Sequence, residues 1–285
     1  MLTAMDKKTS VTSQDANEFH TAIGHTMTLV RKCLLSAALS AACFGSAVSA
    51  RADDLVILSA AAVRPGLLEV PALFSKATGH RVKLTFGNAT AIESKIMAGE
   101  PADIVILPQE RLRTLAYQGN ALGMVASNAF GIVRLGVAAK SGATKPPIAT
   151  PADLKEALLS ATSFGMPDPA DGSTSSRHLV NMMQQLGIAA QMSSKTKLFP
   201  DGTKALEAVA KGEIALTIAP VTSICTVPGV ALVSPLPEQQ QLKTAYYAAL
   251  TAQSADLQSA RSLINMLFSD EVAVLLQKKC IDLPQ

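Results

Sequence analysis

The sequence predicts an α/β protein of two lobes, each built on a mostly parallel sheet flanked by helices. Short apolar stretches alternate with amphipathic helical stretches from residue 55 to residue 279, and units of this length are typical of parallel sheets that helices cover on both faces. Small and hydroxyl-bearing residues gather at the strand-to-helix turns. About 230 residues follow a distinct N-terminal segment, a length that suits two lobes better than one.

The composition excludes several classes of protein. Hydrophobic residues make up 48% of the 285-residue chain and charged residues 16%, values that exclude a disordered chain, a collagen-like fibre and a disulfide-dense mini-protein. Trp is absent and Tyr occurs three times, which argues against a protein that stacks nucleic-acid bases. Residues 53–285 carry 20 basic and 19 acidic side chains. We therefore expect no polyanion-binding surface and no nucleic-acid partner.

The first 52 residues are interpreted as an N-terminal extension followed by a secretory signal peptide at about 27–52. Arg31 and Lys32 precede an uncharged, Leu- and Ala-rich run at 33–50 that ends in small residues, the pattern of a signal peptide with its cleavage site. A transmembrane anchor is the alternative, but the strongly apolar part is short for one. We therefore expect export through the Sec pathway to the periplasm, with translation starting at Met1 or Met27.

Export determines which of the four cysteines remain in the chain and what they could do there. A lipoprotein would need a leucine-like residue three positions before Cys43, where Ser40 stands, so we expect no lipid anchor. Cys225 and Cys280 would remain in the exported chain and could pair or stay free. No Cys or His spacing in the sequence indicates a metal site, and we expect neither a metal nor a cofactor.

Lobe 1 is predicted to comprise residues 53–136 and 237–285, and lobe 2 residues 137–236. We expect Thr90 and Glu93 to form a capping box at the start of a helix, and Pro71 to kink its helix or delay its start. Thr150, Thr203, Ser254 and Ser269 are the other predicted helix caps. The predicted strands are 55–58, 82–86, 103–107, 130–139, 163–166, 214–219, 230–233 and 246–251, and the predicted helices include 65–77, 111–119, 255–268 and 270–279.

Three strand-to-helix turns are the candidate binding elements. They are Ser59-Ala60-Ala61-Ala62, Gly87-Asn88-Ala89-Thr90 and Gly172-Ser173-Thr174-Ser175-Ser176. In open α/β sheets, ligands bind at the carboxyl ends of strands, where helix N-termini present free N–H groups. The usual role of such residues is only to cap a helix. Three of them on two lobes predict a site for a small anion in the cleft between the lobes.

Several stretches follow one another in the order of a known family. They are 58–62 (LSAAA), 86–90 (FGNAT), 96–104 (IMAGEPADI), Asp168-Pro169, 211–214 (KGEI) and the helix at 269–279. With AGxPAD as the most specific element, residues 54–283 resemble the periplasmic solute-binding proteins of molybdate-type ABC importers. The resemblance implies the type II periplasmic-binding-protein fold, two hinged lobes that close on a molybdate- or tungstate-like oxyanion. It also implies a monomer, an inner-membrane ABC permease complex as partner, and no catalytic residues.

Site residues implied by the resemblance include two departures from the family. One family serine falls on Ala62 and another at or beside Ala89, so two hydroxyl donors are missing, and Ser59, Asn88 and Thr90 are candidates to replace them. The second-lobe contact falls on Thr174-Ser175 beside Ser173, a backbone contact on Val221-Thr222, and the family's tyrosine on Tyr246. We therefore expect a divergent branch in which the second lobe carries more of the affinity.

Two arginines suggest that the ligand belongs to a different class of anion. Arg134 lies inside an apolar strand and Arg177 one turn into a helix. An arginine facing the cleft would offer a bidentate fork to a carboxylate, sulfate or phosphonate. The alternative is that both are solvated or paired outside the cleft, which we favour for Arg177.

Two further functions stay open. A periplasmic hydrolase could use Asp168, Ser173 or Ser175, and His178, but the sequence around these serines is not GxSxG and His178 lies on the same stretch of chain. A sensory binding module that reports to a membrane kinase could use the same fold. Hinge segments are expected near 134–137 and 234–242.

Overall fold

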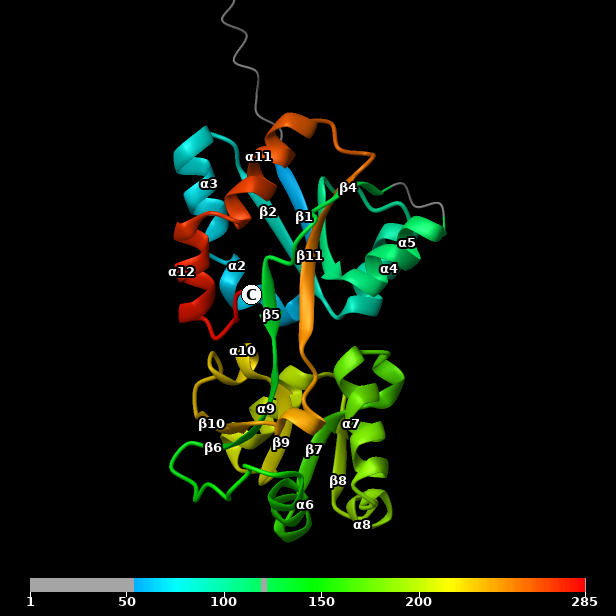
Figure 1. Ribbon diagram of the computed structural model, residues 1–285, viewed down its shortest axis with the longest axis vertical. Helices are drawn as coiled ribbons and strands as arrows, with labels where there is room; N and C mark the ends of the chain where they lie inside the picture. The colour runs from blue at the N-terminus through cyan, green and yellow to red at the C-terminus, as the bar shows by residue number, and fades with distance from the viewer. Residues whose placement is uncertain (1–53, 119–121, 285) are drawn as a thin grey trace, which may run out of the picture. The chain divides into compact units, whose positions relative to one another are not determined.

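The computed structural model describes residues 54–118 and 122–284 (Figure 1). The predicted signal peptide, both possible start sites, Cys33 and Cys43 lie outside the described residues. Within those residues the helices and strands form two lobes, each with its own sheet and its own buried apolar core. The two-lobed α/β class predicted from the sequence is confirmed.

Lobe 1 is built on a six-stranded sheet. The order is β2-β1-β3-β11-β4, and β5 also pairs with β11. β1 runs parallel to β2 and β3, whereas β11 runs antiparallel to β3, β4 and β5. The strands are β1 (Leu55–Ala60), β2 (Val82–Gly87), β3 (Ile104–Pro108), β4 (Leu122–Val125), β5 (Gly131–Val133) and β11 (Thr244–Thr251).

Lobe 2 is built on a five-stranded sheet in the order β10-β6-β9-β7-β8. β7 is parallel to β8 and β9, whereas β6 is antiparallel to β9 and β10. The prediction of mostly parallel sheets therefore holds for β1–β3 and β7–β9 but not for the strands next to the lobe crossings. The strands are β6 (Leu135–Lys140), β7 (Phe164–Pro167), β8 (Thr196–Phe199), β9 (Leu216–Pro220) and β10 (Val230–Pro235).

Helices cover both faces of each sheet (Figure 1). In lobe 1, α2, α3, α11 and α12 lie on one side and α4 and α5 on the other. Lobe 1 contains η2 (Ala61–Val63), α2 (Arg64–Leu67), α3 (Val70–Thr78), α4 (Ala89–Met97), α5 (Gln109–Tyr117), α11 (Leu257–Leu267) and α12 (Asp270–Lys278). Lobe 2 contains α6 (Pro151–Ser160), η3 (Pro169–Asp171), α7 (Thr174–Gln185), α8 (Ala189–Ser193), α9 (Gly202–Lys211) and α10 (Val221–Ile224), and η4 (Glu238–Gln240) lies on the return toward lobe 1.

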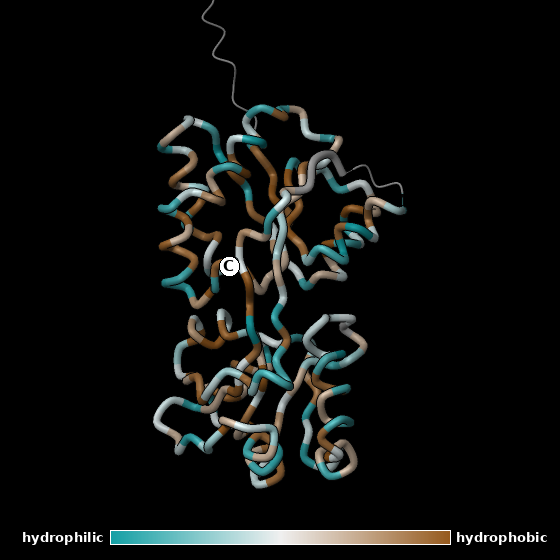
Figure 2. The backbone as a smooth tube through the Cα atoms, in the orientation of Figure 1, coloured by the Kyte–Doolittle hydropathy of each residue, from teal (hydrophilic) through white to brown (hydrophobic). Residues whose placement is uncertain are grey.

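Apolar strands account for the position of each core. In β3, every residue from Ile104 to Pro108 is buried, because helices cover both faces of the strand. Phe74 of α3 and Phe164 of β7 are the largest fully buried side chains of their lobes. Figure 2 shows the hydrophobic backbone segments running along the sheets inside each lobe. No helix of the described residues is both long and apolar enough to span a membrane.

The AGxPAD stretch serves the fold of lobe 1. The Asp103 carboxylate accepts the N–H of Val56 at 2.8 Å and the hydroxyl of Ser254 at 2.6 Å. The backbone O of Asp103 also accepts the N–H of Thr251 at 3.0 Å. Asp103 therefore joins the start of β1 to the end of β11, and the most specific motif of the resemblance has a structural role here.

Helix caps are partly as predicted. Thr150 and Asp153 form a capping box at α6, and Ser269 caps α12. The helix predicted from residue 65 divides in two, and Pro71 lies in the first turn of α3, as expected for a delayed start. Asp256 rather than Ser254 caps α11, and its side chain accepts the N–H of Ser259 at 2.9 Å.

The caps predicted at Thr90 and Thr203 are wrong. Asn88 caps α4, accepting the N–H of Ala91 at 2.8 Å, and Asp201 caps α9 through the N–H of Lys204 at 2.9 Å. Glu93 does not reach back to the cap. Its carboxylate is 2.7 Å from the Arg111 guanidinium, and this nearly buried ion pair joins α4 to α5.

The chain crosses between the lobes twice. The long strand predicted at 130–139 breaks at Arg134, because β5 belongs to the first sheet and β6 to the second. The return passes from β10 to β11 through η4. Leu135 and Gly136 thus belong to the second sheet, while the predicted lobe limits at 136/137 and 236/237 remain a prediction.

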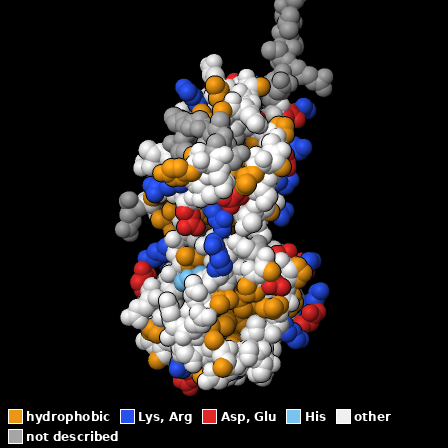
Figure 3. All heavy atoms as spheres, turned by 90° about the vertical axis from the view of Figure 1, so that its right-hand side faces the viewer, with side chains coloured by type: hydrophobic (Ala, Val, Ile, Leu, Met, Phe, Trp, Pro, Cys, Tyr) orange, Lys and Arg blue, Asp and Glu red, His pale blue; other side chains and the backbone are white. Residues whose placement is uncertain are grey.

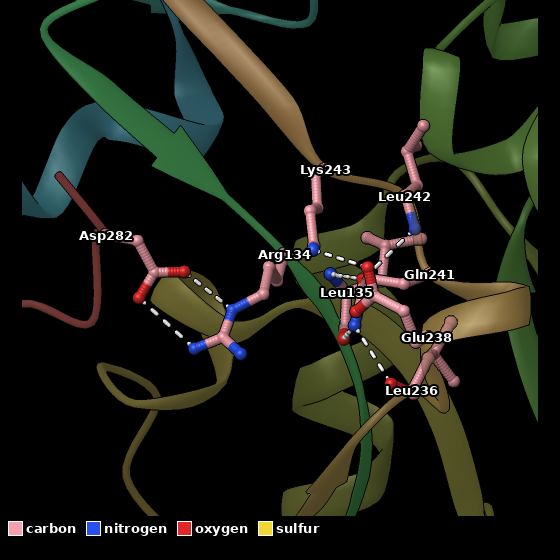
Figure 4. Close-up of polar contacts among 8 residues, drawn as sticks. All are labelled: Arg134, Leu135, Leu236, Glu238, Gln241, Leu242, Lys243 and Asp282. Carbon is pink, nitrogen blue, oxygen red and sulfur yellow. Dashed lines mark hydrogen bonds and ion pairs between the residues drawn. The ribbon is translucent and has the colours of Figure 1, made fainter. Parts of the chain in front are cut away.

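Gln241 braces the crossing (Figure 4). Its side-chain amide accepts the N–H of Leu135 at 2.8 Å and donates to the backbone O atoms of Leu135 and Leu236, each at 3.1 Å. The amide therefore satisfies backbone groups of both crossing segments, much as a neighbouring strand would.

Candidate functional site

A cavity of about 410 Å³ lies between the two lobes. It is found at the carboxyl ends of β1, β2 and β3 in lobe 1 and of β7, β8 and β9 in lobe 2, where ligands of open α/β sheets bind. Lobe 1 lines it with Ala60, Ala61, Ala62, Gly87, Asn88, Ala89, Pro108, Thr244 and Tyr246. Lobe 2 lines it with Pro167, Ser173, Thr174, Ser175, Pro200, Asp201, Gly202, Thr203, Leu206, Ile218, Ala219, Pro220 and Ser223.

Three helices of at least nine residues begin at this cavity. They are α4, capped by Asn88, α7, capped by Ser173, and α9, capped by Asp201. The first N–H groups of a helix lack partners within it and carry partial positive charge. Their convergence from both lobes gives the cavity N–H donors with partial positive charge. Such donors favour an anion without any ionised side chain.

Thr174, the first residue of α7, presents an unused hydroxyl. Among the described residues, three buried side-chain N or O atoms have no hydrogen-bond partner, and Thr174 Oγ1 is the one of these that belongs to a cavity-lining residue. A buried hydroxyl without a partner costs about 1–3 kcal/mol. A ligand that accepted a hydrogen bond from this hydroxyl would remove that cost.

Ionised side chains are scarce in the cavity. Among the described side chains of its lining there is no Lys, Arg or His, and Asp201 is the single carboxylate. Burial raises the pKa of Tyr246, so that its phenol remains a neutral hydroxyl. On the face of the molecule drawn in Figure 3, basic and acidic side chains are interspersed over both lobes. An anion in the cavity would therefore be held by neutral donors.

The structure brings most of the predicted site residues together. Of those predicted, it places in the cavity lining Ala61, Ala62, Asn88, Ala89, Ser173, Thr174, Ser175 and Tyr246. The carboxyl ends of the parallel strands meet at the same edge in each lobe, which explains why turns distant in sequence converge. That these residues contact a ligand remains a prediction.

Five predicted residues lie outside the lining, namely Arg134, described below, and Ser59, Thr90, Val221 and Thr222. Ser59 is fully buried, and its hydroxyl donates to the backbone O of Ala60. Thr90 and Thr222 instead connect the lobes: Thr90 Oγ1 donates to the O of Gly172 at 3.0 Å, and Thr222 Oγ1 to the O of Ala62 at 2.7 Å. Val221 begins α10, and its neighbours Pro220 and Ser223 line the cavity in its place.

Gly172 allows the Thr90 contact. Its φ is +68°, and an added Cβ would lie 2.9 Å from Thr90 Oγ1. Only glycine combines this backbone conformation with so close an approach. The two lobes therefore touch beside the cavity in this structure.

Arg134 does not line the cavity. Its guanidinium forms an ion pair with Asp282, at 2.6 Å from Nε to Oδ2 and 3.1 Å from Nη2 to Oδ1 (Figure 4). Asp282 engages the Nε and Nη2 edge of the guanidinium, a geometry that does not support an arginine fork for the ligand at Arg134, and the hypothesis stays a prediction. Arg177 is exposed and also lies outside the lining, as we favoured.

His178, the candidate base of a hydrolase triad, makes a contact outside the cavity. His178 lies outside the cavity lining, and its Nε2 is 2.8 Å from the backbone O of Gln240. Within the described residues there is also no group of three or more His, Cys, Asp or Glu side chains that could hold a metal ion.

Sequence reasoning missed a second lobe-2 turn of the site, residues 200–203. Pro200, Asp201, Gly202 and Thr203 follow β8 and lead into α9. The Pro-Asp-Gly sequence is a turn signal that could have been used, but the strand before it was not predicted. Ser223 and Thr244 were missed as well.

Comparisons with known proteins agree with this architecture. Residues 55–279 match the family of bacterial extracellular solute-binding proteins. An aconitate isomerase from Pseudomonas sp. is 30% identical over 233 residues, which are 78% of this chain and 85% of that protein.

Solved structures share the fold. The periplasmic molybdate-binding protein of Azotobacter vinelandii matches with a TM-score of 0.67 at 17% identity, covering 81% of this chain and 100% of that one. PEB3 of Campylobacter jejuni with bound L-phospholactate matches with a TM-score of 0.62 at 15% identity, covering 80% and 99%. The fold and the match over residues 55–279 lead to one conclusion: the chain is a member of the bacterial extracellular solute-binding protein family.

Proposed function

We propose that this protein binds a small organic anion carrying carboxylate groups in the cavity between its lobes and delivers it to an ABC importer. The observation that carries the proposal is the Thr174 hydroxyl, buried and without a partner at the point where α4, α7 and α9 begin. A carboxylate can accept hydrogen bonds from this hydroxyl and from helix N-terminal N–H groups at the same time.

The size of the cavity favours an organic anion over a tetrahedral oxyanion. Four oxygen atoms, each with the share of a water molecule, occupy roughly 120 Å³, against about 410 Å³ in the cavity. Because Thr90 and Gly172 are already in contact, this space does not come from widely parted lobes. Ala62 and Ala89 also lack the hydroxyls expected of a molybdate binder. The relationship to an aconitate isomerase and the fold shared with phospholactate-bound PEB3 support the same ligand class.

Calorimetry with a panel of anions tests this proposal. We would titrate trans-aconitate, citrate, molybdate and sulfate into the protein at one ionic strength. A tricarboxylate is expected to bind at least tenfold more tightly than molybdate or sulfate. Tighter binding of molybdate would show that the ligand is an oxyanion and not a tricarboxylate. If none of the four binds, the proposal of an anion site is contradicted.

Isomerisation of a tricarboxylate is the second candidate function. Interconversion of the geometric isomers of aconitate requires a base that removes a proton from the methylene carbon. Asp201 is the one carboxylate among the described side chains that line the cavity, and a relative at 30% identity is named aconitate isomerase. Asp201 is therefore our candidate for the base.

The variant Asp201→Asn separates binding from catalysis. Asn caps helices as well as Asp does, so α9 should remain intact. Proton NMR of cis-aconitate incubated with the protein would detect the trans isomer. Conversion by the natural protein and its loss in Asp201→Asn, with binding retained, would establish isomerase activity. If the natural protein leaves cis-aconitate unchanged, isomerisation is rejected and ligand binding is the function that remains.

Export, a monomeric state and docking to an inner-membrane permease complete the proposal. Mass spectrometry of the periplasmic fraction would detect an N-terminus near Asp53 and no lipid. Pull-down of a permease by the ligand-loaded protein would support import, and pull-down of a sensor kinase would favour the sensory alternative. An N-terminus at Met1 in the periplasmic protein would contradict a cleaved signal peptide.

A further inference from the structure

Cys225 and Cys280 meet although they belong to different lobes. Cys225 ends α10 of lobe 2, and Cys280 lies two residues beyond the last helical residue of α12 in lobe 1. Arg134 connects their two segments: its backbone O accepts the N–H of Val221, the first residue of α10, at 2.9 Å, and its guanidinium pairs with Asp282, two residues after Cys280. The two thiols lie close enough to interact electrostatically, and both are free in this structure. The two cysteines are 55 positions apart in the sequence, so the fold and not local sequence brings them together.

The backbone at Cys280 is unusual for a residue with a side chain. Cys280 is the one residue other than glycine with a positive φ, 61°, among the described residues. Its N–H donates to the O of Gln277, and the N–H of Ile281 donates to the O of Leu276. These two bonds form a Schellman motif, in which glycine is the preferred residue at this position. A cysteine there carries a conformational cost that glycine would avoid.

We propose that Cys225 and Cys280 are a site of disulfide formation that links the two lobes. The family is extracellular, and disulfides form and persist in such oxidising compartments. The link would fix the lobes at the separation seen here, where Thr90 also contacts Gly172.

The reaction is a thiol–disulfide exchange with a disulfide-bearing oxidant. Burial, followed by the neighbouring Cys280 thiol, raises the pKa of Cys225 to about 12. One of the two cysteines, as a thiolate, attacks one sulfur of the oxidant and displaces the other as a thiolate. The second cysteine, losing its proton, then attacks the sulfur of the first and displaces the remaining sulfur of the oxidant. The two protein thiols lose two electrons and two protons in total, and the oxidant gains them as two thiols.

Disulfide formation would change ligand exchange, a consequence that rests on the proposed function. The cavity lies between lobes that must part to release a ligand. Oxidation is therefore expected to slow the dissociation of trans-aconitate by at least tenfold, while reduction restores fast exchange.

Intact-mass measurement tests the disulfide without a ligand. The full chain with Cys33→Ser and Cys43→Ser retains only the two thiols in question. After treatment with oxidised glutathione, we expect most molecules to lose both free thiols and become lighter by two hydrogen atoms. Cys225→Ser and Cys280→Gly are the matched controls, and each should retain one thiol or carry one glutathione. A natural pair that only becomes glutathionylated, or stays reduced, would overturn the proposal.

Scattering and release rates test the locking. The ligand-free oxidised chain should be more compact than the reduced chain in solution scattering, and identical radii of gyration would contradict a lock. Stopped-flow release of trans-aconitate should be at least tenfold slower after oxidation, and equal rates would also contradict it. If the disulfide forms and compacts the protein but trans-aconitate does not bind, the ligand assignment fails and the disulfide stands.

Discussion

Replacing Thr174 by Val should have opposite effects on the free protein and on its complex. The Thr174 hydroxyl is buried without a partner, which costs about 1–3 kcal/mol. Val keeps the branched shape and puts a methyl group in place of the hydroxyl. We expect the ligand-free variant to be more stable by about 1 kcal/mol, which raises Tm by roughly 2–4 °C for a chain of this length.

Ligand affinity should fall in the same variant. A hydrogen bond to a charged group contributes about 1.5–3 kcal/mol, which corresponds to a loss of about tenfold to somewhat over a hundredfold in Kd. Differential scanning calorimetry of the free protein and titration calorimetry with trans-aconitate measure the two effects.

Thr217→Val is the matched control in the same lobe. Thr217 is buried too, but its hydroxyl donates to the O of Gly165 at 2.7 Å and it lies outside the cavity lining. The control should therefore lose about 1 kcal/mol of stability and keep its affinity. A Thr174→Val variant that is less stable than the natural protein and binds trans-aconitate unchanged would refute the reasoning.

Three further substitutions address two ion pairs and the backbone at Cys280. Arg134→Met should change trans-aconitate affinity by no more than about threefold and stability by less than about 1 kcal/mol, because the half-exposed pair with Asp282 is screened by solvent. A larger loss of affinity in calorimetry would place Arg134 at the ligand. Glu93→Gln should lower the free energy of unfolding in urea by about 2–4 kcal/mol, since it leaves the Arg111 charge nearly buried and unpaired. An unchanged free energy of unfolding would show that the pair is solvated. Cys280→Gly should stabilise the reduced chain by about 1 kcal/mol because its φ is positive; a loss of stability in reductant would indicate that the side chain is needed for packing.

Local patterns in the sequence predicted the elements whose causes are local. Thr150 and Asp153 lie three residues apart and form the predicted capping box. The turns after β1 and β2 and the turn before α7 converge on the cavity, because alternating strands and helices already imply where strand ends meet. The residues of β8 are only partly buried or exposed. Their sequence is too short and too polar to predict a strand, and the turn at Asp201 that follows was therefore not predicted either.

Contacts across long sequence separations account for the remaining errors. Thr90 has the local sequence pattern of a helix cap, but the backbone O of Gly172, 82 positions away, accepts its hydroxyl hydrogen bond. Arg134 has no acidic neighbour in sequence, and its partner Asp282 lies 148 positions away. A single sequence contains no signal for either pairing, since neither depends on periodicity or on spacing.

A crystal structure of the protein grown with trans-aconitate tests the central claim most directly. The claim is that the cavity between the lobes is the ligand site and that its neutral donors hold an organic anion. We expect one carboxylate within about 3 Å of Thr174 Oγ1, facing the start of α7, and the remainder of the molecule extending toward Asn88 and Tyr246. A ligand bound beside Arg134 or on the outer surface, with the cavity filled only by water, would contradict the account.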